Sequence, residues 1–77
     1  MKLPVVSGKE VIRVLKKLGF SIDRQKGSHV QMVKIIEGEE RLVTVPIHSN
    51  KKLIPFVFKS IAKQAGYSTK EFADFFR

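Results

Sequence analysis

One stretch decides the fold, and it reads SHVQMVKIIEGEERLVTVP over residues 28–46. Residues 28–36 are rich in Val and Ile, which favour extended strands. Residues 37–40 are polar and include the glycine that a tight hairpin turn favours. Residues 41–45 form a second strand, which ends at Pro46 because proline has no N–H to donate to a ladder. The stretch therefore predicts an antiparallel hairpin with a turn over 37–40.

The two faces of this hairpin differ in character. Successive side chains on a strand point to opposite faces. Val30 and Met32 therefore share one face, whereas His29, Gln31 and Val33 share the other. We expect the helices to cover the Val30 and Met32 face, which leaves His29 and Gln31 on the open face or at its edge.

A helix and a short strand are predicted before the hairpin. Ser7–Glu10 reads as a capping box, and Gly19 is a typical C-terminal stop. The segment between them repeats apolar residues at helical spacing: Val11, Val14, Leu15 and Leu18. Residues 20–25 then predict a strand, and Gly27-Ser28 a turn back into the hairpin.

A second long helix and a short third helix are predicted after the hairpin. Pro55 suits a first helical turn, Gly66 ends the helix, and the apolar positions in between are Phe58, Ile61, Ala62 and Ala65. Ser68–Glu71 is another capping box. It opens a terminal helix that carries three phenylalanines, which pack in the core or present a surface to a partner: Phe72, Phe75 and Phe76.

The order of elements predicts an α+β fold. It is α-β-β-β-α with a short C-terminal helix, in one domain over residues 1–77, and a three-stranded antiparallel sheet with both main helices on one face is the economical packing. This is the element order of the double-stranded-RNA-binding fold. A chain of 77 residues has little room for a deep cavity. We therefore expect a shallow site that suits a polymer.

Composition narrows the class of partner. The chain has 15 Lys and Arg against 7 Asp and Glu, a net charge of +8, which is typical of nucleic-acid binding. The lack of cysteine excludes disulfides and thiolate metal ligands and fits the reducing cytoplasm. No signal-peptide pattern or long apolar run suggests secretion or a membrane span.

The segment Arg24–His29 holds the groups that phosphodiester chemistry needs. Histidine exchanges a proton near neutral pH, with an unperturbed pKa of about 6.5. Gly27 allows positive φ or close approach of a partner. Arg24 and Lys26 supply positive charge, and Ser28 or Lys26 can orient a phosphate. A strand histidine is more often merely exposed or hydrogen-bonded, so this pattern alone leaves both interpretations open.

The same segment resembles the HicA family of toxin ribonucleases. The resemblance is carried by R-Q-K-G-S-H-V-Q-M, then T-V-P-I-H, then I-A-K-Q-A-G-Y-S-T-K-E-F, and it extends from about Ser7 to Phe72. It implies the double-stranded-RNA-binding architecture, an mRNA substrate, a cognate HicB-type antitoxin that covers the site, and a toxin–antitoxin hetero-oligomer. It also implies that His29 is the catalytic residue.

Transesterification of RNA needs both a base and an acid. His48, in Pro46-Ile47-His48, matches a recurrent feature of the family and is the candidate for the second proton transfer, although a capping or structural role stays open. No acidic cluster or Cys/His ligand set appears in the sequence, so we expect neither a metal nor a cofactor.

Further basic residues are candidates for phosphate contacts. Lys51 and Lys52 precede the second main helix and either bind RNA or are simply solvated. The basic residues of the first helix are more often a solvated face: Lys9, Arg13, Lys16 and Lys17. HicA sequences often carry Gly-Thr-Leu where this chain has residues 55–57, Pro-Phe-Val. The resemblance therefore implies no RNA contact for that turn.

Two rival functions remain at this stage. One is a non-catalytic RNA-binding module with the same fold and charge. The other is a degenerate toxin that serves as a protein-interaction domain.

Overall fold

Helix α1 (Gly8–Lys17) begins with the predicted capping box. The Glu10 backbone N–H donates to Ser7 Oγ at 3.3 Å, and the Ser7 backbone N–H donates to the Glu10 carboxylate at 3.1 Å. The helix stops before Gly19, whose φ of 101° lies in the left-handed region. Its apolar side faces the sheet. This structure is a computed structural model, and it describes residues 2–48 and 51–77.

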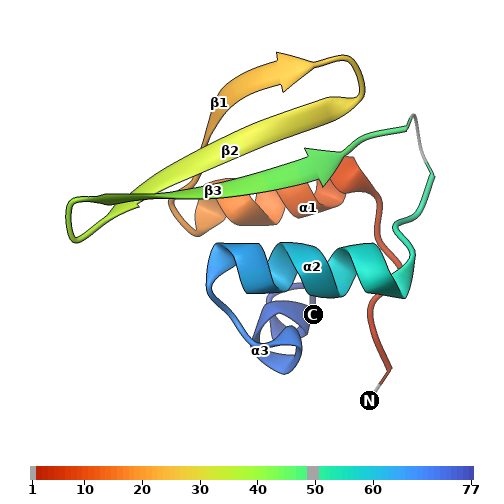
Figure 1. Ribbon diagram of the computed structural model, residues 1–77. Helices are drawn as coiled ribbons and strands as arrows, with labels where there is room; N and C mark the ends of the chain where they lie inside the picture. Colours follow the sequence, from red (N-terminus) through yellow and green to blue (C-terminus); the bar gives the residue numbers. More distant parts are fainter. Residues whose placement is uncertain (1, 49–50) are drawn as a thin grey trace.

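The sheet has three antiparallel strands in the order β1-β2-β3. They are β1 (Ser21–Lys26), β2 (His29–Ile36) and β3 (Glu39–Pro46), as Figure 1 shows. Strand β2 is therefore central and pairs along its length with β3, from His29 opposite Pro46 to Ile36 opposite Glu39. The predicted three-stranded antiparallel sheet is confirmed.

The turn between β2 and β3 is shorter than the predicted turn over 37–40. Glu37 and Gly38 have φ values of 51° and 82°, and these two left-handed residues reverse the chain by themselves. This is the pattern of the type I′ hairpin turn, whose twist matches that of the flanking strands. Glu39 and Glu40 are then free to pair with Ile36 and Ile35. The expectation that they belong to the turn was wrong.

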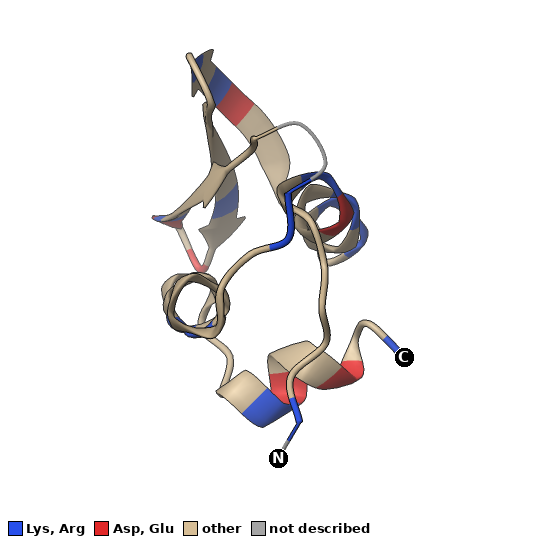
Figure 2. Cartoon of the chain, turned by 90° about the vertical axis from the view of Figure 1, so that its right-hand side faces the viewer, with Lys and Arg blue, Asp and Glu red and all other residues tan. Residues whose placement is uncertain are grey.

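The helices lie together on one face of the sheet (Figures 1 and 2). Helix α2 (Pro55–Ala65) ends at Gly66, whose φ is 92°, and α3 (Thr69–Asp74) opens with a capping box between Ser68 and Glu71. The core between the layers contains Val6, Val11, Leu15, Phe20, Val30, Met32, Val43, Val45, Phe58, Ile61, Ala62, Ala65, Phe72 and Ala73. The predicted α+β architecture is confirmed.

Helix α3 is fixed to α2 by aromatic packing. The Phe72 ring centroid lies 5.3 Å from that of Phe58 and 5.3 Å from that of Phe76. Phe72 is completely buried, so it is a core residue and no surface for a partner. Phe75 is 41% exposed and packs edge-on against Tyr67 at 5.1 Å.

Within the part of the chain that the structure describes, no helix is long and apolar enough to cross a membrane.

Candidate functional site

His29 is the first residue of β2, and its side chain is exposed. It stands opposite Lys26 on β1 and opposite Pro46 on β3. Directly opposite residues in an antiparallel pair carry their side chains on the same face. The structure thus places His29 on the face of the sheet that the helices do not cover, between one cationic neighbour and one rigid apolar neighbour.

An irregularity in β1 brings a second cation to this face. Ile22 pairs with Met32 but Arg24 pairs with Gln31, so Asp23 is an extra residue in the ladder. A β-bulge of this kind changes the direction of the side chains that follow it. Without the shift, Arg24 would stand opposite Val30 and point toward the helices. With it, Arg24 shares the open face with Gln31, next to Lys26 and His29.

The cations on this face are accessible to a phosphate. Arg24 Nε lies 3.9 Å from the Asp23 carboxylate, and their side chains are 74% and 45% exposed. Such a surface pair contributes at most about 1 kcal/mol, so it does not hold Arg24 away from a ligand. Among residues 2–48 and 51–77, Lys26 has no carboxylate within ion-pairing distance. Both side chains can therefore turn toward an anion at His29.

The turn before His29 is anchored by the main chain. Gly27 has a φ of 59°, and a glycine at the first of two turn residues is what the type II′ hairpin turn requires. The Ile47 N–H donates to the Ser28 carbonyl at 2.6 Å. This bond ties the Gly27-Ser28 turn to the segment that carries His48. Gly27 and Ser28 thus set the course of the backbone just before His29, and a contact of either with RNA stays a prediction.

Gly8 explains how this segment lies so close to α1. A Cβ atom at Gly8 would overlap the Pro46 carbonyl oxygen and would lie 2.9 Å from Ile47 Cγ2. The start of α1 therefore packs directly on the backbone at the end of β3. Sequence reasoning missed this role, because glycine at the first position of a helix gives no indication of which distant segment it contacts.

His48 is exposed and belongs to the same corner of the molecule. The Lys51 N–H donates to the His48 carbonyl at 2.9 Å. His48, Lys51 and Lys52 line a hollow of about 240 Å³ together with Pro46, Leu53, Ile54 and Val57. His48 follows Pro46 by two residues, and Pro46 pairs with His29. The candidate second proton-transfer group thus lies at the same end of the sheet as His29.

The two lysines before α2 have different partners. Lys52 Nζ lies 3.3 Å from Glu10 Oε1, and Lys52 also pairs with Ser7 in an isolated β-bridge. The hydrogen bond from the Ser7 backbone, followed by that from Lys52, holds the pKa of Glu10 below its ordinary value. Lys51 has no carboxylate partner among the described residues. Lys51 is therefore the freer cation for a phosphate, and Lys52 also joins its segment to α1.

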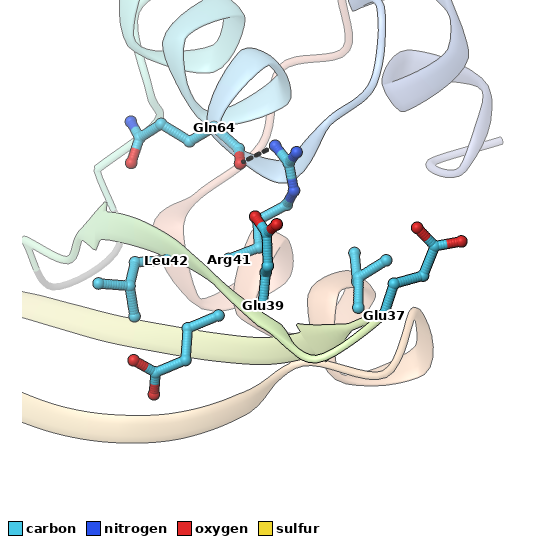
Figure 3. Close-up of a pocket in the computed structure, with 7 residues that line it drawn as sticks. Glu37, Glu39, Arg41, Leu42 and Gln64 are labelled. Atoms are coloured by element: carbon cyan, nitrogen blue, oxygen red, sulfur yellow. Dashed lines mark hydrogen bonds between the residues drawn. The ribbon is translucent and has the colours of Figure 1, made fainter.

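A larger hollow, of about 460 Å³, lies at the other end of the β2–β3 hairpin. Figure 3 shows that Glu37 and Glu39 stand at it, and that Arg41 reaches across to the Gln64 carbonyl, a hydrogen bond of 3.1 Å. Glu40 also lines it. Because this hollow gathers three of the chain's seven acidic residues, it repels a polyanion. Of the two, the basic corner around His29 is the better candidate for a nucleic-acid site.

Figure 2 looks onto the end of the molecule where β1, the end of β3 and the start of α2 meet. Basic segments lie on the sheet, around α1 and on the loop that leads into α2. No group of three or more potential metal ligands occurs among the described residues.

Comparison with known proteins agrees with this architecture. A search among curated proteins gives no match. A family model described as the HicA toxin of bacterial toxin–antitoxin systems matches residues 8–67, which include α1, the whole sheet, both histidines and α2. The chain therefore belongs to the HicA toxin family.

Proposed function

We propose that this toxin is an endoribonuclease that cleaves mRNA in the cytoplasm, without a metal ion, and so arrests translation. The observation that carries the proposal is the position of His29. It is exposed at the start of β2, directly opposite Lys26, and it shares the open face with Arg24. An imidazole beside two cations on an open surface suits a phosphodiester of a long polymer.

The chemistry is an internal transesterification. His29 accepts the proton of a ribose 2′-hydroxyl, and the oxygen attacks the adjacent phosphorus. The bond from phosphorus to the 5′-oxygen breaks, and that oxygen takes a proton from a general acid. Arg24 and Lys26 stabilise the negative charge that develops on the phosphate oxygens. The products are a 2′,3′-cyclic phosphate and a 5′-hydroxyl.

His48 is the candidate for the general acid. It lies at the same end of the sheet as His29, and the hydrogen bond between Ile47 and Ser28 couples their two segments. Lys51, whose N–H donates to the His48 carbonyl, adds positive charge beside it. These features support His48 as the group that makes the second proton transfer.

A HicB-type antitoxin would neutralise the toxin by covering the open face in a hetero-oligomer. Ile35 and Leu42 lie on the same face as His29 and are 61% and 44% exposed. Exposed apolar side chains next to a functional site suit a protein cover. Such a cover would bury the imidazole and exclude RNA.

Cleavage of single-stranded RNA in the presence of EDTA tests the proposal. The wild type should yield fragments that end in a 2′,3′-cyclic phosphate. His29→Ala should cut about 10²- to 10⁴-fold more slowly, the usual contribution of one acid–base group. It should bind the same RNA with nearly unchanged affinity. Lys59→Ala, which removes an exposed cation from α2, is the control and should cut like the wild type.

The rival is a non-catalytic RNA-binding module. It predicts salt-dependent RNA binding by both proteins but no fragments from either. If the wild type leaves RNA intact and its expression does not slow growth, the nuclease proposal is wrong. A chain that neither cuts nor binds RNA, yet binds an acidic partner, would be a degenerate toxin.

A further inference from the structure

The hollow at the start of α2 is lined by residues of two chemical kinds. Four of the residues that line it are apolar, Pro46, Leu53, Ile54 and Val57, and three are basic, His48, Lys51 and Lys52. No acidic residue of the described chain lines it. This composition differs from that of the larger hollow, where three glutamates gather.

Two large exposed apolar side chains flank Pro55 at the start of α2: Ile54, which lines the hollow, and Phe56, whose chain neighbour Val57 lines it. Ile54 is 61% exposed and Phe56, on the first turn of α2, is 77% exposed. Helices α1 and α3 both have a capping serine at the N-cap position, but the N-cap of α2 is Ile54, which makes no side-chain capping hydrogen bond. A capping serine or asparagine would stabilise the helix. An exposed isoleucine at the N-cap departs from this preference for a capping side chain. Such departures are more common at functional positions.

The hollow adjoins the candidate catalytic histidine. Pro46 forms part of its wall and is also the residue opposite His29 in the β2–β3 ladder. A nucleotide whose phosphate lies at His29 therefore has its neighbouring nucleotide within reach of the hollow. Lys51 also lines the hollow and supplies a cation for a phosphate of that neighbouring nucleotide.

We propose that this hollow and the exposed Phe56 form a subsite for one unstacked nucleobase of the RNA, next to the scissile phosphate. The inference rests on the proposed function and extends it by naming where one base of the substrate binds. Single-stranded RNA is recognised largely through bases that leave the stack and pack against apolar or aromatic side chains. Apolar and cationic side chains around one hollow provide for both halves of a nucleotide, the base and its phosphate.

The test measures binding of short RNAs in which one nucleotide at a time lacks its base. All proteins carry His29→Ala, so that binding is measured without cleavage. With the Ile54 and Phe56 side chains intact, removal of one particular base should weaken binding about fivefold or more, the low end of base–aromatic stacking. Bases elsewhere should matter less.

The same RNAs are then tested with Ile54→Ser and Phe56→Ala. Both variants should bind the intact RNA about fivefold more weakly and should no longer distinguish it from the RNA lacking that base. Ile54→Ser places a capping residue at the helix start, so the fold should be retained. A thermal melt checks this.

Ile35→Ser is the matched control. Ile35 has the same exposed fraction as Ile54, 61%, but lies six residues along β2 from His29, or about 20 Å at the rise of a strand. This variant should bind every RNA as the parent protein does.

The outcomes separate the two proposals. If wild-type protein cuts RNA but no single base matters, or if Ile54→Ser keeps the full dependence on that base, the subsite is wrong and the nuclease stands. If Ile54→Ser and Phe56→Ala leave RNA binding unchanged but weaken binding of a co-expressed antitoxin, the patch is a protein interface and the inference fails. If wild-type protein does not cut RNA, the proposed function fails. The binding measurements with RNAs that lack one base still show whether the hollow holds a base.

Discussion

At the scale of single residues, the site depends on backbone positions as much as on reactive side chains. Gly27 turns the chain just before His29, and Gly8 lets α1 press on the end of β3. Neither contributes a functional group. Each sets where an imidazole stands, so substitution of either would act on activity through geometry.

Glu37 is the non-glycine residue that has a positive φ among residues 2–48 and 51–77. It has a φ of 51° in the type I′ turn, where residues other than glycine, asparagine and aspartate are disfavoured. We expect Glu37→Asn to stabilise the fold by about 0.5–1 kcal/mol, because asparagine tolerates the left-handed region. Urea unfolding measures the change. Glu39→Gln, which removes a nearby charge from a residue in the ladder, is the control, and an equal gain from both variants would show that charge, not conformation, is responsible.

At the scale of elements, the ends of α1 and α3 depend on ionised glutamates. The hydrogen bond from the Ser68 backbone lowers the pKa of Glu71 from its ordinary value of 4.5. A carboxyl whose pKa is lower in the folded state contributes stability above its unfolded pKa and loses it as the pH falls through the folded pKa. The same sign holds for Glu10.

We therefore expect stability to fall below about pH 4.5 partly through these two caps. Glutamine can replace glutamate in a capping box but does not titrate. The difference in Tm between wild type and Glu71→Gln should favour the wild type at pH 6 and shrink as the pH approaches 3. A difference that stays constant over this range would contradict the assignment.

Helix α3 lies outside the residues that match the family model, 8–67, yet it completes the core. Phe72→Ala should cost about 3–5 kcal/mol, because its ring is completely buried between Phe58 and Phe76. This is a large share of the stability of so small a domain. Phe75→Ala should cost less than half as much, since Phe75 is 41% exposed. Equal costs in urea unfolding would show that α3 is not part of the core.

Sequence patterns predicted those features that depend only on residues close together in the chain. The capping boxes at Ser7 and Ser68 and the stop at Gly66 needed no knowledge of the rest of the chain. The alternation of β2 was enough to place His29 on the open face. The extra residue at Asp23 was not predictable, because a register shift depends on how two strands pair.

The bounds of the β2–β3 turn and the grouping of the site residues also depend on contacts between segments distant in sequence. Glu39 and Glu40 suggest a loop by composition, but cross-strand pairing extends β3 over them. The grouping of Pro46, His48 and Ile54 around one hollow depends on how the end of β3 meets α2. Such long-range packing leaves no periodic pattern in a single sequence.

At the scale of the whole molecule, charge is distributed unevenly. Three of the seven acidic residues are Glu37, Glu39 and Glu40 at the far end of the hairpin, and Glu10 is paired with Lys52. The corner around His29 keeps Arg24, Lys26 and Lys51. We therefore expect a nucleic acid to be attracted toward the end of the sheet that carries the histidine.

Salt dependence of RNA binding tests whether that corner makes the contacts. We expect Lys26→Ala to weaken binding of single-stranded RNA and to reduce the slope of log K against log salt by about 0.7, the value for one phosphate contact. Lys70→Ala removes the same charge from an exposed position on α3 and should leave the slope unchanged. If both variants lower affinity equally, attraction is by net charge alone and no contact is made at His29.

The hydrogen bond from the Ile47 N–H to the Ser28 carbonyl has a consequence for how the toxin can vary. Because both atoms belong to the main chain, most replacements at either position keep the bond and the spacing of the two imidazoles. Proline at position 47 is the exception, since it has no N–H to give. The two segments that carry the histidines can therefore stay joined with many different side chains at positions 28 and 47, provided that position 47 retains an amide hydrogen.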